Sequence, residues 1–370
     1  MVYRDFGKTG LKVSALGFGA MRLPEDVDEA VTVMRHAFDQ GVNFLDTAPV
    51  YGDSEIKCGK ALEGRRDQVM LSTKIPSWEE GPVERWRERL DNSLRRLSTS
   101  YIDVLQVIHG LAWPFFEEHM APKGKICDMA ERARDEGLIH HFSFSTHDSP
   151  EGVLKLIETG WFEGLIAQYN FLDRQYEKCF EAAAERGMGV VVMGPVGGGR
   201  LAGLSSELMK LVPGDVASNP EAALRFVLAN RNVSSAISGM NTTQMVDENV
   251  RTCSREEPMS AEEWERVGKA LDECRSLAEL YCTGCGYCMP CPHGVDIPGN
   301  FSLMNHHRVY GLTDWAKRRY AHKPKEREEG DEKAKLYAGA CTECGECEPK
   351  CPQKIPIIQQ LAETHTALGA

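Results

Sequence analysis

Eight of the thirteen cysteines stand in two short motifs, CTGCGYCMPCP at residues 282–292 and CTECGECEPKCP at residues 341–352. Thiolates can ligate zinc or iron–sulfur clusters, and paired thiols can form disulfides. Disulfides conflict with the reducing compartment expected for this chain. Zinc sites usually pair two CxxC units across a longer gap, whereas cysteines at consecutive two-residue intervals suit the corner irons of a cubane. The spacing therefore predicts iron–sulfur clusters.

The second motif, C-x2-C-x2-C-x3-C-P, is the run of bacterial ferredoxins, in which the fourth cysteine ligates the other of two [4Fe-4S] clusters. The first motif departs from this run because its last gap has two residues instead of three. The long separation of the motifs resembles that of helical two-cluster modules fused to larger oxidoreductases. By analogy, one cluster is expected on Cys282, Cys285, Cys288 and Cys351, and the other on Cys341, Cys344, Cys347 and Cys291.

A second group of chemically capable side chains lies in the first third of the chain: Asp46, Tyr51, Lys74 and His109. An aspartate beside a lysine holds the ammonium in place, and an ammonium close to a phenol favours the phenolate and lowers its pKa. Tyr51 then becomes a usable general acid that protonates a carbonyl oxygen as hydride reaches the carbon. His109 is expected to donate a second hydrogen bond that orients the substrate.

These side chains follow strand-like apolar runs that alternate with amphipathic helical patterns. The eight runs are residues 13–18, 42–46, 69–74, 102–109, 141–145, 165–170, 189–195 and 235–239. Near-continuous apolar strands, each joined to the next by a helix, suit a closed parallel barrel whose chemistry lies at the carboxyl ends of the strands. A doubly wound open sheet is the alternative, but its Gly-rich GxGxxG turn is absent after the first strand. Residues 3–14 predict a hairpin at the bottom of the barrel.

The barrel pattern stops after residue 255, and a predicted helix over residues 260–280 leads into the first cysteine motif. Between the two motifs we expect helices joined by a solvated, highly charged loop. The predicted fold class is therefore α/β. A (β/α)8 TIM barrel over residues 1–258 is followed by a small, mainly helical two-cluster ferredoxin-like domain over residues 259–370.

Most of residues 1–252 resembles the aldo-keto reductases. The resemblance is carried in order by GFGAMRLP (17–24), DTAPVYGDSE (46–55), STK (72–74) and IHG (108–110). It implies reduction of a carbonyl substrate by NAD(P)H, with Asp46, Tyr51, Lys74 and His109 as the catalytic tetrad.

The resemblance also implies a nicotinamide cofactor across the carboxyl ends of the strands. It places Ser145 and Gln168 at the carboxamide, and both residue types can hydrogen-bond an amide. Met193 stands where many members stack an aromatic ring on the nicotinamide, and Thr146 stands where the family usually has Asn. The cofactor positions carried over are Gly19, Ala20, Met21, Ser145, Gln168, Met193, Pro195, Gly197, Gly198, Gly199, Ser238, Gly239, Met240, Gln244, Glu248 and Asn249.

The adenosine end of the cofactor falls on SGMNTTQMVDEN, residues 238–249, with Glu248 and Asn249 at adenine positions. This segment holds no Lys or Arg, the cations that normally grip a 2'-phosphate. The choice between NAD and NADP therefore stays open. No sequence feature dictates flavin binding, and Arg22 and His147 are candidate substrate contacts.

The net charge of −12 argues against nucleic-acid binding, which depends on clustered Lys and Arg. No run of about 18 apolar residues occurs, and the first residues lack an apolar stretch of signal-peptide length. We therefore expect a cytoplasmic protein that does not cross a membrane.

Three functions fit both halves. The first is a carbonyl reductase whose clusters are structural or sense redox state. In the second, the clusters bring electrons from ferredoxin or another redox partner into the barrel, through a flavin or a radical step. Such an intermediary is needed because a nicotinamide gives two electrons at once, whereas each cluster accepts one. In the third, the barrel is a scaffold for an electron-transfer subunit, and the intact tetrad speaks against that function.

Overall fold

The computed structural model describes residues 1–76, 81–171, 173–196, 212, 216–273, 282, 284–308, 313–326 and 335–369. Apart from residue 212, the described residues up to Trp264 form one compact unit and those from Glu265 onward form a second. The division falls inside helix α11 (Ala261–Glu273). The domain boundary predicted between residues 258 and 259 stays a prediction.

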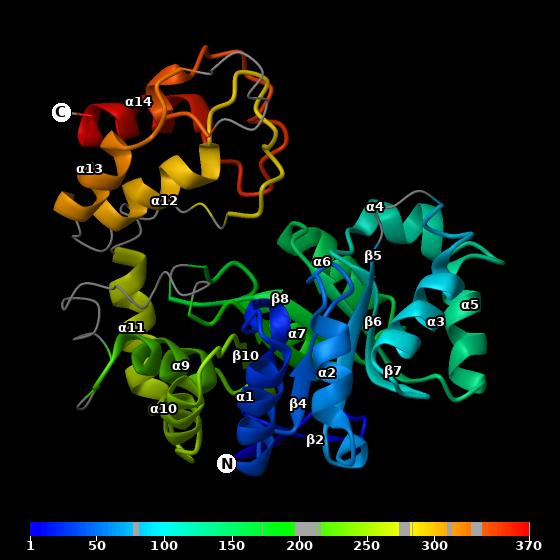
Figure 1. Ribbon diagram of the computed structural model, residues 1–370. Helices are drawn as coiled ribbons and strands as arrows, with labels where there is room; N and C mark the ends of the chain where they lie inside the picture. The colour runs from blue at the N-terminus through cyan, green and yellow to red at the C-terminus, as the bar shows by residue number, and fades with distance from the viewer. Residues whose placement is uncertain are drawn as a thin grey trace. The chain divides into compact units, whose positions relative to one another are not determined.

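Within the described part of the first unit, eight parallel strands close a barrel in the order β10-β3-β4-β5-β6-β7-β8-β9 (Figure 1). This architecture confirms the predicted TIM barrel. The strands are rich in Val, Ile, Leu and Phe, which suits strands buried on both faces. Their bounds are β3 (Leu16–Gly19), β4 (Phe44–Asp46), β5 (Met70–Pro76), β6 (Ile102–His109), β7 (Ile139–Thr146), β8 (Gly164–Gln168), β9 (Gly189–Met193) and β10 (Ser235–Ser238).

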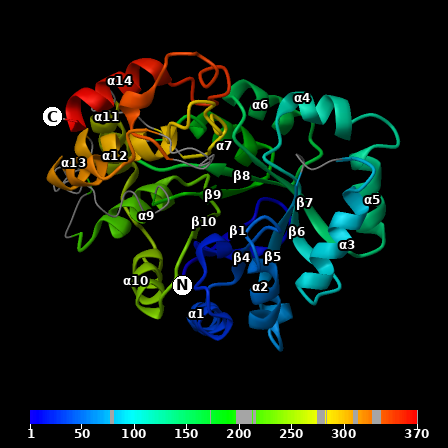
Figure 2. The same ribbon diagram turned by 45° about the horizontal axis from the view of Figure 1, so that its top comes forward.

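Helices surround this barrel, as the turned view shows (Figure 2). Several begin at side-chain caps: Asp26, Ser149, Ser218 and Thr242 each accept a hydrogen bond from a backbone N–H of the first turn. The longer helices are α1 (Val27–Asp39), α2 (Ser54–Leu62), α3 (Trp86–Arg96), α5 (Ile126–Asp135), α6 (Pro150–Glu158), α7 (Glu177–Glu185), α9 (Asn219–Ala229) and α10 (Thr243–Cys253). Short turns are η1 (Ala20–Arg22), η2 (Arg66–Gln68), α4 (Trp113–Phe115) and η3 (Phe116–Met120).

An antiparallel hairpin of β1 (Tyr3–Asp5) and β2 (Lys12–Ser14) confirms the predicted one. It sends Phe6 into the barrel, where the ring fills the space beside Gly164 and Gly189. A Cβ on these glycines would lie only 2.5 and 2.3 Å from the ring. Because Gly164 and Gly189 begin β8 and β9, the hairpin closes the amino ends of the strands. The carboxyl ends are left for chemistry.

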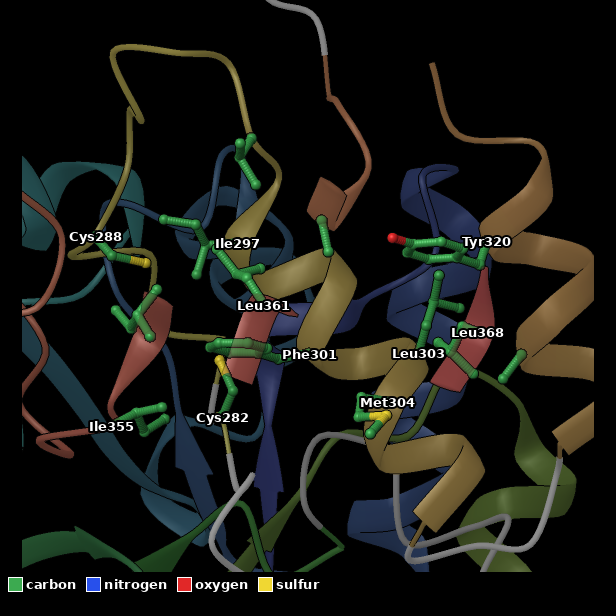
Figure 3. Packing of buried hydrophobic residues seen from close by; sticks show 14 residues of the cluster. Cys282, Cys288, Ile297, Phe301, Leu303, Met304, Tyr320, Ile355, Leu361 and Leu368 are labelled. Carbon is green, nitrogen blue, oxygen red and sulfur yellow. The ribbon is translucent and has the colours of Figure 1, made fainter. Parts of the chain in front are cut away.

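The second unit is mainly helical, with α12 (Ile297–Arg308), α13 (Thr313–Ala321), η6 (Ala338–Ala340) and α14 (Ile357–Leu368). Fourteen of its described residues form one hydrophobic cluster. In Figure 3, Phe301 and Leu361 lie in the middle of this cluster, with Cys282 and Cys288 toward one side and Tyr320 toward the other. The cysteine motifs are therefore part of the core of this unit.

Candidate functional site

A buried ion pair stands at the carboxyl ends of β4 and β5. Lys74 Nζ donates to Asp46 Oδ2 at 2.5 Å and to the Thr47 carbonyl at 2.8 Å. Both side chains are at most 5% exposed. Burial works to lower the pKa of Lys74, but the charges of Asp46 and Tyr51 and hydrogen bonds to both raise it above its ordinary value. Lys74 therefore stays an ammonium at neutral pH.

Tyr51 and His109 stand beside this pair. The Lys74 ammonium lies 5.2 Å from the centre of the Tyr51 ring, and the Tyr51 and His109 rings meet edge to face with centres 6.3 Å apart. Burial, followed by the charges of Lys74 and His147, lowers the pKa of His109 to about 3. At neutral pH this imidazole is uncharged and can donate one hydrogen bond. The structure thus brings all four tetrad residues together.

Two polar side chains inside the barrel extend the ion pair. The Ser72 hydroxyl lies 2.8 Å from Asp46 Oδ1 and 3.0 Å from the Gln106 amide. Ser72 and Gln106 are both fully buried. Asp46 is therefore contacted by Lys74 on one oxygen and by Ser72 on the other.

The two residues predicted at the carboxamide are both held in place at strand ends. Ser145 is buried in β7, and its hydroxyl accepts from Gly110 N at 3.2 Å. Gln168 ends β8 and donates from Nε2 to Asp173 Oδ2 at 2.9 Å. Asp173 is buried, and desolvation raises the pKa of its carboxyl to about 6, although hydrogen bonds from Gln168 and Gln175 oppose this.

The remaining predicted cofactor residues divide between surface and interior. Met21 is exposed, Met193 and Pro195 are respectively half-buried and buried, and Ala20 and Met240 are buried. Gly19 and Gly239 lie side by side, because β3 and β10 are neighbours. The three glycines at residues 197–199 lie outside the described residues.

At the end of β10, the predicted adenosine segment makes two internal contacts. Asn249 is buried and donates to Ser238 Oγ at 3.2 Å, whereas Gln244 donates to Glu248 at 2.9 Å on the surface. Gln244 and Glu248 are thus accessible to a ligand. Their roles and that of Asn249 stay predictions.

The eight motif cysteines surround two cavities in the described part of the second unit. One is lined by residues of the first predicted set, Cys282, Cys285, Cys288 and Cys351. The other is lined by Cys288 and by the second predicted set, Cys291, Cys341, Cys344 and Cys347. Each cavity thus combines three cysteines of one motif with the last cysteine of the other.

The surroundings of these cavities suit clusters of several irons. Ile297 of α12 lines both cavities, while Ile357 and Ile358 at the start of α14 each line one. Burial raises the pKa of the Cys288 thiol to about 12, and the charges of Cys282, Cys285 and Cys351 add to this. Among the described residues, no three His, Cys, Asp or Glu side chains converge as ligands of a single ion would.

Comparison with known proteins agrees with this geometry. A sequence model of the aldo/keto reductase family matches residues 15–272, and a 4Fe-4S dicluster domain matches residues 281–355. The first match covers well over half of the chain. The chain belongs to the aldo/keto reductase family.

Relatives of this aldo/keto reductase cover mainly the barrel. L-galactose dehydrogenase of Arabidopsis thaliana is 29% identical in an alignment of 308 positions that covers 75% of this chain and 94% of the plant protein. An uncharacterised oxidoreductase of Bacillus subtilis is 27% identical over 68% of this chain and 90% of its own length. The holo form of an aldo-keto reductase from Bacillus halodurans is 30% identical, with a TM-score of 0.64, over 73% of this chain and 96% of that structure. The protein is thus an aldo/keto reductase-type oxidoreductase with a 4Fe-4S dicluster domain.

Sequence patterns assign no role to three residues near this site, Ser72, Gln106 and Asp173. Ser72 and Gln106 carry a signal, because they are polar residues within apolar strands. Asp173 carries none, because its burial depends on the fold. Arg22 Cβ lies 3.8 Å from where a Cβ of Gly239 would be, and its role as a substrate contact stays a prediction. Within the described residues, no helix is long and apolar enough to span a membrane.

Proposed function

We propose that this protein reduces a carbonyl compound with NAD(P)H at the barrel site and binds two [4Fe-4S] clusters in its C-terminal domain, residues 259–370. The observation that carries the proposal is the buried Asp46–Lys74 pair beside Tyr51, with the neutral imidazole of His109 across from it. A bound nicotinamide supplies the hydride. The substrate is a small molecule, and the enzyme is proposed to work in the reducing cytoplasm.

Each tetrad residue then has one task. Tyr51 gives its phenolic proton to the carbonyl oxygen as the carbon accepts hydride. The Lys74 ammonium, held by Asp46, stabilises the phenolate left behind. His109 donates a hydrogen bond to the same oxygen, and its lowered pKa keeps it from competing as an acid. Because Lys74 and Asp46 are buried, their charges act on Tyr51 with little screening by water.

Cofactor binding is proposed for the strand ends that surround this tetrad. Ser145 and Gln168 are held by backbone and carboxylate partners, so their polar atoms are fixed before a carboxamide arrives. Gln244 and Glu248 are accessible at the adenosine end. Arg22, an exposed cation beside Gly239, offers the positive charge that residues 238–249 lack.

The clusters are proposed to be held by crossed sets of thiolates, as the two cavities support. Cys282, Cys285, Cys288 and Cys351 would ligate one cluster, and Cys341, Cys344, Cys347 and Cys291 the other. Bound clusters carry single electrons. A ferredoxin or another redox protein is therefore the class of partner that such a domain would meet.

Tyr51→Phe tests the barrel proposal. The substitution removes the acid but keeps the ring, so kcat for carbonyl reduction by NAD(P)H is expected to fall by about 10²–10⁴-fold. Tyr3→Phe is the matched control, because it removes a phenol hydroxyl that bonds the Gly41 carbonyl at the amino end of the barrel. Equal turnover of the two variants would rule out Tyr51 as the acid.

A further inference from the structure

The Ser72 hydroxyl has more hydrogen-bond acceptors than it can serve. It lies 2.8 Å from Asp46 Oδ1 and 3.0 Å from the position of Gln106 Oε1. A hydroxyl has one hydrogen and can donate it to one acceptor, although its oxygen can accept two further bonds. If Gln106 presents its oxygen, one of these two short contacts has no hydrogen in it.

The other end of the Gln106 amide gives a second reason to turn this group. Its Nε2 position is fully buried and has no hydrogen-bond partner among the described residues. The amide nitrogen and oxygen of a glutamine exchange places by a half-turn about the last side-chain bond. Which of the two faces Ser72 follows from the hydrogen bonds that each orientation allows. After the half-turn, the amide donates to Ser72 and the hydroxyl is free to donate to Asp46. Two hydrogen bonds form where one was possible.

We propose that Gln106 is a positioning residue for the catalytic ion pair, with its amide nitrogen donating to Ser72 Oγ and the Ser72 hydroxyl donating to Asp46 Oδ1. Asp46 then accepts from Ser72 on one oxygen and from Lys74 on the other. The chain of donors runs in one direction, from β6 through β5 to β4. Aligned hydrogen bonds of this kind polarise and strengthen one another in a buried setting.

The consequence for the reaction rests on the proposed function of Tyr51. The hydrogen bond from Ser72 partly neutralises the negative charge of Asp46. This hydrogen bond therefore influences how strongly Asp46 attracts the Lys74 ammonium. Lys74 in turn sets how readily Tyr51 releases its proton. Gln106 is fully buried beside Ser72, and it acts through Ser72 and Asp46.

Neutron diffraction from deuterium-exchanged crystals of the full chain tests the direction of the chain without any need for turnover. The expected map shows deuterium on the Gln106 atom that faces Ser72, and the Ser72 deuteron directed at Asp46. A Ser72 deuteron directed at Gln106 would overturn the proposal. Because this result does not depend on activity, it stays separate from the Tyr51→Phe test of the proposed function.

Gln106→Glu provides a kinetic test, because the two orientations of the Gln106 amide predict opposite changes of kcat with pH. The introduced carboxyl is buried, so its pKa is expected to be raised. At low pH it is protonated, donates to Ser72 as the amide does, and kcat should match the wild type. At high pH it is a carboxylate that accepts from Ser72, so kcat should fall by about tenfold, the scale of one lost bond to a charged group.

The KM for NAD(P)H should not change in this variant, and Gln68→Glu on the exposed surface should follow the wild-type pH profile throughout. If the amide oxygen faces Ser72 instead, the carboxylate would replace it well. Activity would then be kept at high pH and lost at low pH, which would refute the proposal.

Discussion

The barrel site and the cysteine domain gather their reactive groups in opposite ways. In the barrel, Asp46, Lys74 and His109 come from separate strands, and burial together with the Asp46–Lys74 hydrogen bond holds the ion pair in place. In the second unit, the reactive groups come from two short motifs, and Cys282 and Cys288 belong to the hydrophobic cluster itself. Packing of the barrel positions the first site, whereas the cysteines of the second site are themselves part of the core of their unit.

This difference between the two sites follows from the cores of the two units. The barrel interior is filled by strand side chains and closed by Phe6. The cluster of the second unit has fourteen described residues and borders the two pockets that the motif cysteines line. Metal binding to such a unit supplies part of its folding free energy.

The largest effect is expected from removing iron. Anaerobic chelation of the full chain should unfold residues 265–370, and the barrel should stay folded because its core contains none of the motif cysteines. Limited proteolysis with mass spectrometry would show cleavage confined to the second unit. Equal protection of both units after iron removal would break the comparison.

Single cysteine variants sharpen the same point. Cys351→Ala should remove the same cluster as Cys285→Ala, and Cys291→Ala the same cluster as Cys344→Ala, because each pair lines one cavity. Iron content should fall by about half in each, and EPR of the reduced protein should show which cluster is missing. Cys127→Ala in α5 is the control that should keep all iron.

Lys74→Met tests how far packing fixes the barrel site. It leaves Asp46 buried without its cation, and breaking a buried pair in this way costs about 3–5 kcal/mol of folding free energy. Urea unfolding of the barrel measures the loss. Lys12→Met breaks the exposed pair with Asp5, in which both side chains are more than 60% exposed, and should cost less than about 1 kcal/mol. Similar losses in the two variants would show that burial does not strengthen the Asp46–Lys74 pair.

The smallest effect concerns Asp173, a carboxyl that the barrel site buries beside Gln168. Its folded pKa of about 6 lies above the ordinary value of 3.8, so between these values the folded protein holds a proton that the unfolded chain has lost. The free energy of unfolding therefore falls as pH rises from about 4 to 6. Asp173→Asn removes this dependence and should be more stable than the wild type above pH 6, by up to about 3 kcal/mol.

Urea midpoints between pH 4 and 7 measure this difference. Asp5→Asn, which changes an exposed carboxyl, should give a curve parallel to the wild type. A parallel curve for Asp173→Asn as well would mean that Asp173 is not buried as a neutral acid.

Much of the fold and site could be predicted because the signals are local. Apolar runs joined by helical patterns predicted the barrel, and residues at the ends of those runs predicted Asp46, Lys74 and His109. The hairpin at residues 3–14 followed from its turn. Each of these depends on neighbours within a few residues, where spacing and side-chain type are sufficient.

The sequence by itself determined which thiols and which tetrad residues this protein has, since type and spacing are written in the chain. The tertiary structure decided how Ser72 meets Asp46 and Gln106, and that Asp173 is buried beside Gln168. These relations join residues between 5 and 34 positions apart in the chain. They depend on strand register and on which side chains exclude water, and neither can be derived from local spacing.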